Sequence, residues 1–458
     1  MRVGAGRTLL TPEPGVELAG YGYYLGRTWD RVRDDLNVTA VVFDDGTNAV
    51  AVASLDILYA DADFADQVRQ RVSDLTDMTP ADVMIACTHS HNAPTCAAIE
   101  GAGVVDPTFR SRAVEHTVEA VATAWNRRQE ATLHVGRADF DELIFNRTRT
   151  DGPTDGRIIV VRADARDGSP LAILVNYAAH PTVMADLGRA NVSRDYPGQV
   201  LDGLELRFRP AFGAFLQGAC GDVNFERHFE NPDKCREPGI ALLAATTEAV
   251  ERAEPMDAPT VAAISHRVTL PTRRWTDEEI EADYAEGTRR LATGDVEGWR
   301  DTLGRVMVNR PDIFVEQRYG GNVEDAVKAL ARFAVTWSER ARAALRTRPE
   351  TLETEVQAFR IGELALVANP AELFSTFALS VRSRCAFEDL MIVGYANDRI
   401  GYVPDAQDIA ARRYGSVQSP KFCNQFPFTE QTGEVLADAM VETLAAVTGP
   451  TGSTDSNP

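Results

Sequence analysis

The sequence predicts an α/β protein with a mixed, largely parallel sheet flanked by helices. Short apolar runs of strand length recur along the chain, and each ends in a turn rich in Gly, Asn or Pro before a polar residue. Segments with helical periodicity alternate with these runs, as in sheets that are covered by helices. With 458 residues, 44% of them hydrophobic, the chain is long enough to bury a large core.

Each expected strand delivers polar residues to its carboxyl end. The five runs are 83–87, 171–175, 212–216, 364–367 and 390–393. Amphipathic patterns predict helices at 109–128 and 240–253, and the Asp44-Asp45-Gly46 turn predicts a hairpin over 38–55. Because ligands bind at the carboxyl edge of open α/β sheets, we expect the residues after the strands to converge there. These residues are His89, His91, His180, Asp222, Glu372 and Tyr402.

Residues 275–347 differ in character from the rest of the chain. They are charged, helical in period and free of His and Cys, and they begin with an N-cap and acidic first turn at Thr276-Asp277-Glu278-Glu279. We expect a helical insertion that packs against the sheet or covers the site. The remainder of 1–448 is expected to form a single domain with this insertion, and the polar segment 449–458 a disordered tail.

The bulk composition excludes several partners. A net charge of −21 argues against nucleic acid and against an anionic membrane surface. No apolar run reaches about 18 residues, so no transmembrane helix is expected. The start of the chain has no apolar signal region, and the six cysteines form no Cys-x-x-Cys pair. We therefore predict a cytoplasmic protein with reduced thiols.

Two of the chain's seven histidines stand one residue apart, directly after the apolar run 83–87. In an extended backbone, residues i and i+2 point the same way, so His89 and His91 can project together from the strand's carboxyl end. Such a pair indicates metal binding or catalysis. The other interpretation is a polar turn whose imidazoles only bond to backbone groups.

A metal site can be assembled from residues that follow three different strands. His89, His180 and Glu372 would supply two nitrogens and one oxygen, a set that suits zinc. The alternatives are a turn residue for His180, a helix-capping acid for Glu372 and a turn former for Asp222. Tyrosine is a less common ligand, so composition alone does not select Tyr402. The four other histidines have no supporting motif; they are His116, His134, His228 and His266.

Other catalytic signatures are missing from the sequence. There is no Gly-x-Ser-x-Gly elbow, no Gly-x-x-x-x-Gly-Lys-Ser/Thr loop and no His-Glu-x-x-His helix. These absences argue against a serine hydrolase of the α/β type, a P-loop nucleotide enzyme and a zincin.

Taken in order, the motifs resemble the catalytic domain of neutral/alkaline ceramidases. Thr-His-Ser-His-Asn-Ala-Pro at 88–94 resembles the family's Thr-His-Thr-His-Ser-x-Pro signature, and 176–184 resembles its Asn-Trp-x-x-His-Pro-Thr stretch. Asn146-Arg147 resembles its Asn-Arg element. The other matching segments are 3–6, 11–12, 18–22, 193–198, 217–222, 370–372 and 397–403. Together they span nearly the whole chain in the family's order.

This resemblance implies a zinc-dependent amidase that cleaves the amide between a fatty acyl chain and an amino alcohol. Carried over to this sequence, one Zn²⁺ per chain would have the ligands His89, His180, Glu372 and Tyr402. His91 and Arg147 would face the scissile group. We expect His91 to pass a proton to the leaving nitrogen and Arg147 to stabilise the oxyanion. The expected partner is a small-molecule or lipid-like N-acyl substrate.

The chain also departs from the family pattern. The serine once proposed as the family's nucleophile aligns with Asn224, whose amide cannot attack a carbonyl, so metal-activated water is expected instead. Tyr414-Gly415 lacks the glutamate of the family's Tyr-Glu-Gly element. The carboxyl-terminal immunoglobulin-like domain of ceramidases is not expected here. Two alternatives remain: a metal-dependent esterase on the same scaffold, and a non-catalytic binding protein that retains the fold.

Overall fold

The computed structural model describes residues 1–458 except 23–25, 185–190, 210, 232, 299–319 and 449–458. The expected disordered tail, 449–458, therefore lies outside the described residues. None of the helices in the described ranges combines the length and the apolar character needed to cross a bilayer.

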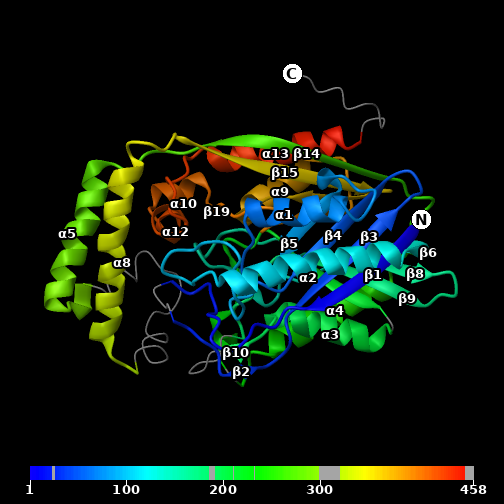
Figure 1. Ribbon diagram of the computed structural model, residues 1–458, viewed down its shortest axis with the longest axis horizontal. Helices are drawn as coiled ribbons and strands as arrows, with labels where there is room; N and C mark the ends of the chain where they lie inside the picture. The colour runs from blue at the N-terminus through cyan, green and yellow to red at the C-terminus, as the bar shows by residue number, and fades with distance from the viewer. Residues whose placement is uncertain (23–25, 185–190, 210, 232, 299–319, 449–458) are drawn as a thin grey trace.

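Two sheets pack face to face, and helices cover their outer faces (Figure 1). The larger sheet has nine strands in the order β11-β9-β8-β6-β1-β3-β4-β5, with β13 paired to β6. Its strands are β1 (Arg2–Leu9), β3 (Asn37–Asp44), β4 (Ala49–Leu55), β5 (Val83–Cys87), β6 (Gln129–Asp139), β8 (Arg157–Ala165), β9 (Pro170–Tyr177), β11 (Phe212–Gln217) and β13 (Glu254–Pro255). The second sheet has the order β14-β15-β16-β18. Its strands are β14 (Val261–Pro271), β15 (Thr351–Ile361), β16 (Leu364–Ala368) and β18 (Leu390–Val393).

The core is divided between three interfaces of these layers. Side chains such as Val41, Leu174 and Leu366 fill the space between the two sheets. Four helices cover the outer face of the larger sheet: α1 (Ala62–Ser73), α2 (Pro107–Asn126), α3 (Asp195–Arg207) and α4 (Glu237–Glu251). Two helices, α9 (Ser375–Arg384) and α13 (Thr432–Ala446), cover the second sheet. Strands β5, β16 and β18 are buried along their whole length, and they read in the sequence as unbroken apolar runs.

The predicted mixed α/β class and the 38–55 hairpin are confirmed, but antiparallel pairs outnumber parallel ones. In the larger sheet only β11–β9 and β4–β5 are parallel, and in the second sheet only β16–β18 is. The largely parallel expectation fails because several neighbouring strands, such as β3–β4 and β8–β9, are joined by short turns rather than by helices. The parallel pairs are nevertheless the ones that carry the predicted site residues at their carboxyl ends.

Short two-stranded ladders, short helices and 3₁₀ turns lie outside the two sheets. Three two-stranded ladders join β2 (Arg31–Val32) to β10 (Asn191–Val192), β7 (Ile144–Asn146) to β12 (Val223–Phe225), and β17 (Ala371–Leu373) to β19 (Gly401–Val403). Short helices follow β19: α10 (Ala406–Ala410), α11 (Tyr414–Val417) and α12 (Ser419–Phe422). Single 3₁₀ turns lie at Pro80–Asp82 and Arg227–Phe229.

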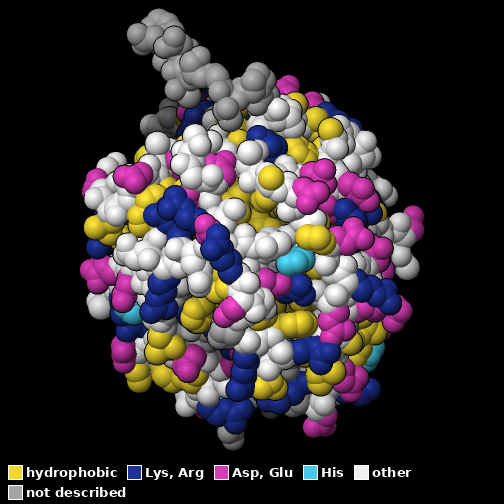
Figure 2. Space-filling model, turned by 90° about the vertical axis from the view of Figure 1, so that its right-hand side faces the viewer, with side chains coloured by type: hydrophobic (Ala, Val, Ile, Leu, Met, Phe, Trp, Pro, Cys, Tyr) yellow, Lys and Arg dark blue, Asp and Glu magenta, His cyan; other side chains and the backbone are white. Residues whose placement is uncertain are grey.

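The described part of the 275–347 insertion is helical, as expected. Helices α5 (Asp277–Thr293) and α8 (Val323–Ala344) pack against each other at one end of the layers, on the left of Figure 1. Thr276 and Glu279 form the predicted capping box. The opposite end of the molecule carries interspersed acidic and basic side chains (Figure 2).

Candidate metal centre

The side chains of His89 and His91 converge, but the backbone between them is not extended. His89 has a φ of 64°, in the left-handed region that side chains other than glycine rarely adopt. The turn after β5 thereby brings the Nε2 atoms of His89 and His91 to 3.2 Å from each other. Both side chains are buried. The sequence-based expectation of convergence is confirmed, while its stated reason, alternation along a strand, is wrong.

His180 joins this pair from the end of β9, a strand near the edge of the larger sheet opposite to β5. Its Nε2 atom lies 3.3 Å from Nε2 of His89. The ligand-capable nitrogens of His89, His91 and His180 all lie within 4.8 Å of one another. Residues distant in sequence are thus brought together at the carboxyl ends of the parallel pairs, as predicted.

Backbone carbonyls define the tautomers of two of these rings. Nδ1 of His89 lies 3.1 Å from the carbonyl oxygen of Leu58, and Nδ1 of His180 lies 2.6 Å from that of Cys220. A carbonyl only accepts hydrogen bonds, so Nδ1 carries the proton in both rings. Each neutral ring therefore presents an unprotonated Nε2 atom to the centre, which is the usual state of a metal-binding histidine.

Glu372 and Tyr402 complete the cluster from the paired strands β17 and β19. Oε2 of Glu372 lies 3.4 Å from Nε2 of His89 and 3.3 Å from Nε2 of His180, yet it accepts no hydrogen bond. The hydroxyl of Tyr402 lies 3.3 Å from Nε2 of His180. A cation bound between facing electron pairs stabilises them in a buried space. Two imidazole nitrogens, a carboxylate and a phenol oxygen fit a zinc-like divalent ion.

The surroundings of His91, His180 and Glu372 lower the pKa of all three groups. Burial and then the charge of Arg147 lower the pKa of His180 to about 3. Burial, followed by His89 and His180, holds the pKa of His91 well below its ordinary value. Burial alone would raise the pKa of Glu372, but positive charge on, or an N–H donated by, His89 or His180 holds that pKa well below the usual range. Low pKa values favour the unprotonated states that metal binding requires.

Arg147 lies beside Tyr402 at the edge of the cluster. Its Nη2 donates to the Tyr402 hydroxyl at 2.5 Å and its Nε donates to the carbonyl of Gly221 at 3.2 Å. Its Nη1 donates to Oδ1 of Asn224 at 3.4 Å. Asn224 therefore helps to orient the guanidinium of Arg147. Burial disfavours the charge of Arg147, but Tyr402 and Glu372 nearby raise its pKa above the ordinary value, so it stays a cation.

Asp222 lies behind the cluster rather than in it. Its carboxylate accepts from Nδ2 of Asn146 at 2.6 Å and from the backbone N–H and hydroxyl of Ser375 at 2.7 and 2.9 Å. Its carbonyl accepts from the backbone N–H of Arg147 at 2.7 Å. The carboxylate thus ties the strand that carries Arg147 to the segment after Glu372.

Sequence reasoning missed Tyr59 and Tyr395. The Tyr59 hydroxyl donates a short hydrogen bond to Oε1 of Glu372, which leaves Oε2 for the centre. The ring of Tyr395 stacks on His89 with centroids 4.1 Å apart. A signal for Tyr59 was available, because it follows β4, the parallel neighbour of β5. No pattern in the sequence marked Tyr395.

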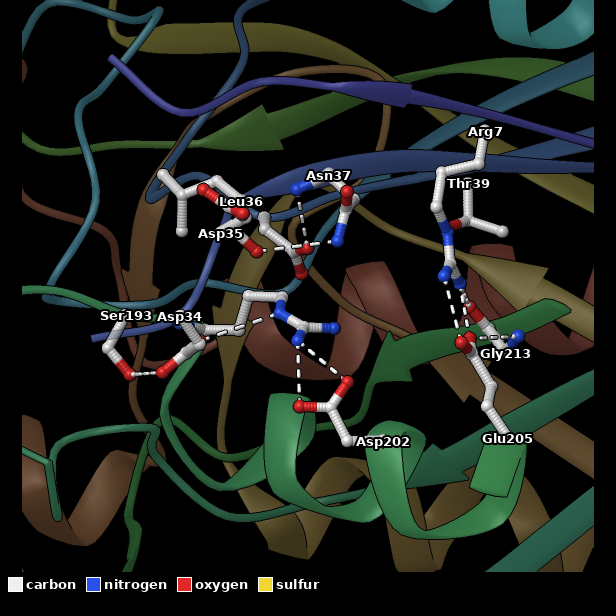
Figure 3. Close-up of polar contacts among 12 residues, drawn as sticks. Arg7, Asp34, Asp35, Leu36, Asn37, Thr39, Ser193, Asp202, Glu205 and Gly213 are labelled. Carbon is white, nitrogen blue, oxygen red and sulfur yellow. Dashed lines mark hydrogen bonds and ion pairs between the residues drawn. The ribbon is translucent and has the colours of Figure 1, made fainter. Parts of the chain in front are cut away.

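A network of charged and polar groups joins the segment before β3 to Ser193 and α3 (Figure 3). Ser193 donates from its hydroxyl to Asp34 at 2.7 Å and from its backbone N–H to the carbonyl of Asn92 at 3.0 Å. The hydroxyl of Ser90 in turn donates to the carbonyl of Ser193 at 2.6 Å. Further along, Arg7 bridges Thr39 and Glu205. The bonds to Ser90 and Asn92 thus connect the histidine turn to Ser193 and, through it, to Asp34.

A small cavity of about 20 Å³ opens onto the cluster. That volume is enough for about one water molecule. The ring of Phe422 in its wall packs on Phe333 of α8, with centroids 5.1 Å apart. The cavity is lined by Gly20, Leu58, Tyr59, His89, His91, Ile99, Ala102, Glu372, Tyr402, Tyr414, Ser419, Phe422 and Cys423.

The remaining histidines lie elsewhere, each beside a local partner. His116 lies against the carbonyl of Leu9 and His266 against the hydroxyl of Thr443. His134 and His228 each lie beside a carboxylate.

Two solved structures of ceramidases have the same architecture. The crystal structure of neutral ceramidase from Pseudomonas aeruginosa superposes with a TM-score of 0.71 at 18% identity, covering 100% of this chain and 76% of that one. A ceramidase complexed with C2 gives 0.71 at 17% identity, covering 100% and 77%. The chain therefore has a neutral ceramidase-like fold. Comparison with protein-family models and with curated protein sequences gave no match.

Proposed function

We propose that this protein is a zinc-dependent hydrolase that cleaves the amide bond of an N-acyl compound, small or lipid-like. The observation that carries the proposal is the convergence of bare Nε2 atoms from His89 and His180 on the unpartnered Oε2 of Glu372. The ceramidase-like fold supports the amide bond as the target. In the reaction, water adds across the C–N bond, so the products are a carboxylic acid and an amine.

One zinc ion per chain would be held by His89, His180, Glu372 and Tyr402. When bound, zinc supplies Lewis acidity that activates water and polarises the amide carbonyl. Arg147 directs its guanidinium at the negative charge that develops on the carbonyl oxygen. His91 gives a proton to the leaving nitrogen, and its neutral resting state lets it first accept that proton. Tyr59 orients Glu372, and Asn224 orients Arg147.

The six cysteines are all free thiols, five of them buried. Thiols persist in a reducing compartment, so we place the protein in the cytoplasm.

The test is the metal content of the purified protein, measured by mass spectrometry together with hydrolysis of paired N-acyl amides and esters. We expect about one zinc per chain, and loss of amide hydrolysis when a chelator removes it. Cleavage of the esters without measurable cleavage of the matched amides would assign an esterase instead. Absence of metal after incubation with zinc would contradict the proposal and leave a binding protein.

A further inference from the structure

The imidazole of His91 is held differently from those of His89 and His180. In the other two rings, Nδ1 is bonded to a backbone carbonyl. Nδ1 of His91 is also buried, but it has no hydrogen-bond partner among the described residues. The direction in which the ring of His91 points is therefore determined by the atoms that pack against it, because no hydrogen bond fixes its Nδ1 side.

Gly20 packs against the Nδ1 side of that ring. A Cβ atom added at Gly20 would lie 2.5 Å from Nδ1, 2.7 Å from Cγ and 3.0 Å from Cε1 of His91. Atoms in van der Waals contact are about 3.5 to 4.0 Å apart, so a residue with a Cβ fits only if the imidazole moves. Gly20 also has a φ of 107°, which glycine adopts without steric cost. The position thus favours glycine for two separate reasons, and one of them concerns only His91.

The segment that carries Gly20 is tied to the backbone around the histidine turn. The backbone N–H of Gly20 donates to the carbonyl of Ala102 at 2.8 Å. The backbone N–H of Leu18 donates to the carbonyl of Arg27 at 2.9 Å, and Nη2 of Arg27 donates to the carbonyl of His91 at 2.7 Å. A side chain at position 20 would therefore displace the imidazole more readily than the backbone that these bonds hold.

Three other rings pack around the imidazole of His91. The ring centroids of Tyr21 and His89 each lie 4.9 Å from that of His91, and the centroid of His180 lies 5.5 Å from it. Gly20 and His91 both line the cavity that opens onto the cluster. A displacement of the imidazole would thus change the position of its Nε2 atom relative to the other two histidines.

We propose that Gly20 is a positioning residue for proton transfer, because the lack of a side chain at this position lets Nε2 of His91 face the centre and the leaving nitrogen. This inference rests on the proposed role of His91 in amide hydrolysis. Relieving a 2.5 Å contact requires a movement of about 1 Å, and a misplacement of that size costs about 100-fold in rate.

The first experiment compares Gly20→Ala with Gly15→Ala in the zinc-loaded protein, on the amide that the wild type cleaves fastest. Gly15 has a φ of 97°, and a Cβ added there meets no atom within 4 Å, so this control matches the backbone strain without the contact. We expect kcat to fall about 100-fold in Gly20→Ala, with KM and zinc content nearly unchanged. Gly15→Ala should retain kcat. Equal kcat in the two variants overturns the inference.

The second experiment asks whether the loss acts through His91. In the His91→Ala background the ring is gone, so adding Gly20→Ala should lower kcat less than about twofold further. A further loss of about 100-fold would mean that the new side chain acts by another route, such as narrowing the cavity, and overturns the inference. If Gly20→Ala fails to fold, the double variant should regain folding, as measured by thermal unfolding. Continued failure in the double variant overturns the inference too.

The third experiment reports on the ring without using activity. The Cε1–H resonances of ¹³C-labelled histidines are recorded on the metal-free protein, and the His91 signal is identified by its absence in His91→Ala. Gly20→Ala should shift that signal, because the imidazole moves relative to the aromatic ring of Tyr21, and Gly15→Ala should not. An unmoved signal overturns the inference. If the wild type cleaves no amide, the proposed function fails, and this signal alone decides whether Gly20 positions His91.

Discussion

The metal centre and the α5–α8 hairpin use charged side chains in opposite ways. At the centre His180 and Glu372 are buried, and backbone carbonyls or a tyrosine hold their second polar atoms. On the hairpin many ion pairs are exposed and local, as in Glu286–Arg289 and Glu324–Lys328, although Asp283 and Arg340 pair with residues elsewhere in the chain. Buried groups must satisfy one another or a ligand, whereas exposed pairs exchange contacts with water at little cost.

This difference indicates where substitution should matter. Three polar atoms of the centre, Nδ1 of His89, Nδ1 of His180 and Oε1 of Glu372, are each positioned by one partner, so a change at any of them should affect a bound metal. The hairpin presents only a few groups to the site, chiefly Phe333, and most of its charges concern its own stability. Substitutions at the metal centre should therefore have larger effects than substitutions on the hairpin.

His180→Ala should produce the largest effect. It removes the nitrogen that faces both Glu372 and Tyr402, so zinc content should fall to near zero and activity with it. Mass spectrometry of the purified variant measures the metal. His266→Ala, a histidine on β14 far from the cluster, should retain full metal content. Unchanged stoichiometry in His180→Ala would remove His180 from the ligand set.

His91→Ala should keep the metal but lose turnover. As the group that moves the proton, His91 is expected to contribute about 10²- to 10⁴-fold to kcat. Metal content and kcat are measured on the same preparation. A matching loss of zinc would instead make His91 a ligand, as its 3.2 Å approach to Nε2 of His89 would allow.

Tyr59→Phe should weaken metal binding by about 10- to 100-fold, the usual effect of removing a group that orients a ligand. The ring stays and only the donor to Glu372 is lost. Competition with a zinc-binding dye reports the affinity. Tyr177→Phe removes an equally buried hydroxyl, bonded at 2.8 Å to the carbonyl of Phe140, and should leave metal affinity unchanged. Equal affinity in both variants would assign Tyr59 a packing role.

Phe333→Ala should change substrate preference without changing metal content. The ring supports Phe422 in the cavity wall, and an aromatic contact of this kind corresponds to about two- to tenfold in KM. The shift should appear for bulky substrates and be absent for acetyl compounds. Leu379→Ala, a partly exposed apolar residue on α9, is the control. An identical KM series would show that the hairpin has no part in the site.

Glu279→Gln should have the smallest effect, confined to stability. Burial alone would raise the pKa of Glu279, but Arg273 and the backbone of Thr276 lower it to about 2. Since the folded pKa lies below the unfolded one, the stabilisation is present above about pH 4.5 and lost as pH falls towards 2. The difference in free energy of unfolding should be about 1 kcal/mol at pH 7 and vanish near pH 2. A difference independent of pH would contradict this.

The sequence predicted more of the site than of the sheet. Apolar runs ending in polar turns located the strands that carry His89, His180 and Glu372, because burial on both faces leaves a readable pattern. An apolar run does not show whether a strand pairs in a parallel or an antiparallel way, or which sheet it joins. The antiparallel majority and the second sheet were therefore not predicted. The left-handed turn at His89 and the stacking of Tyr395 depend on tertiary contacts that no local pattern encodes.

The proposed ligands come from both sheets: His89 and His180 follow strands of the larger one, while Glu372 and Tyr402 lie on the short ladder beside the smaller one. The coordination sphere can exist only after the two sheets have docked. An ion bound there would link the larger sheet to the smaller sheet, which are formed from distant parts of the chain. Metal binding during refolding should therefore occur late. Its rate should report the rate at which the two sheets dock.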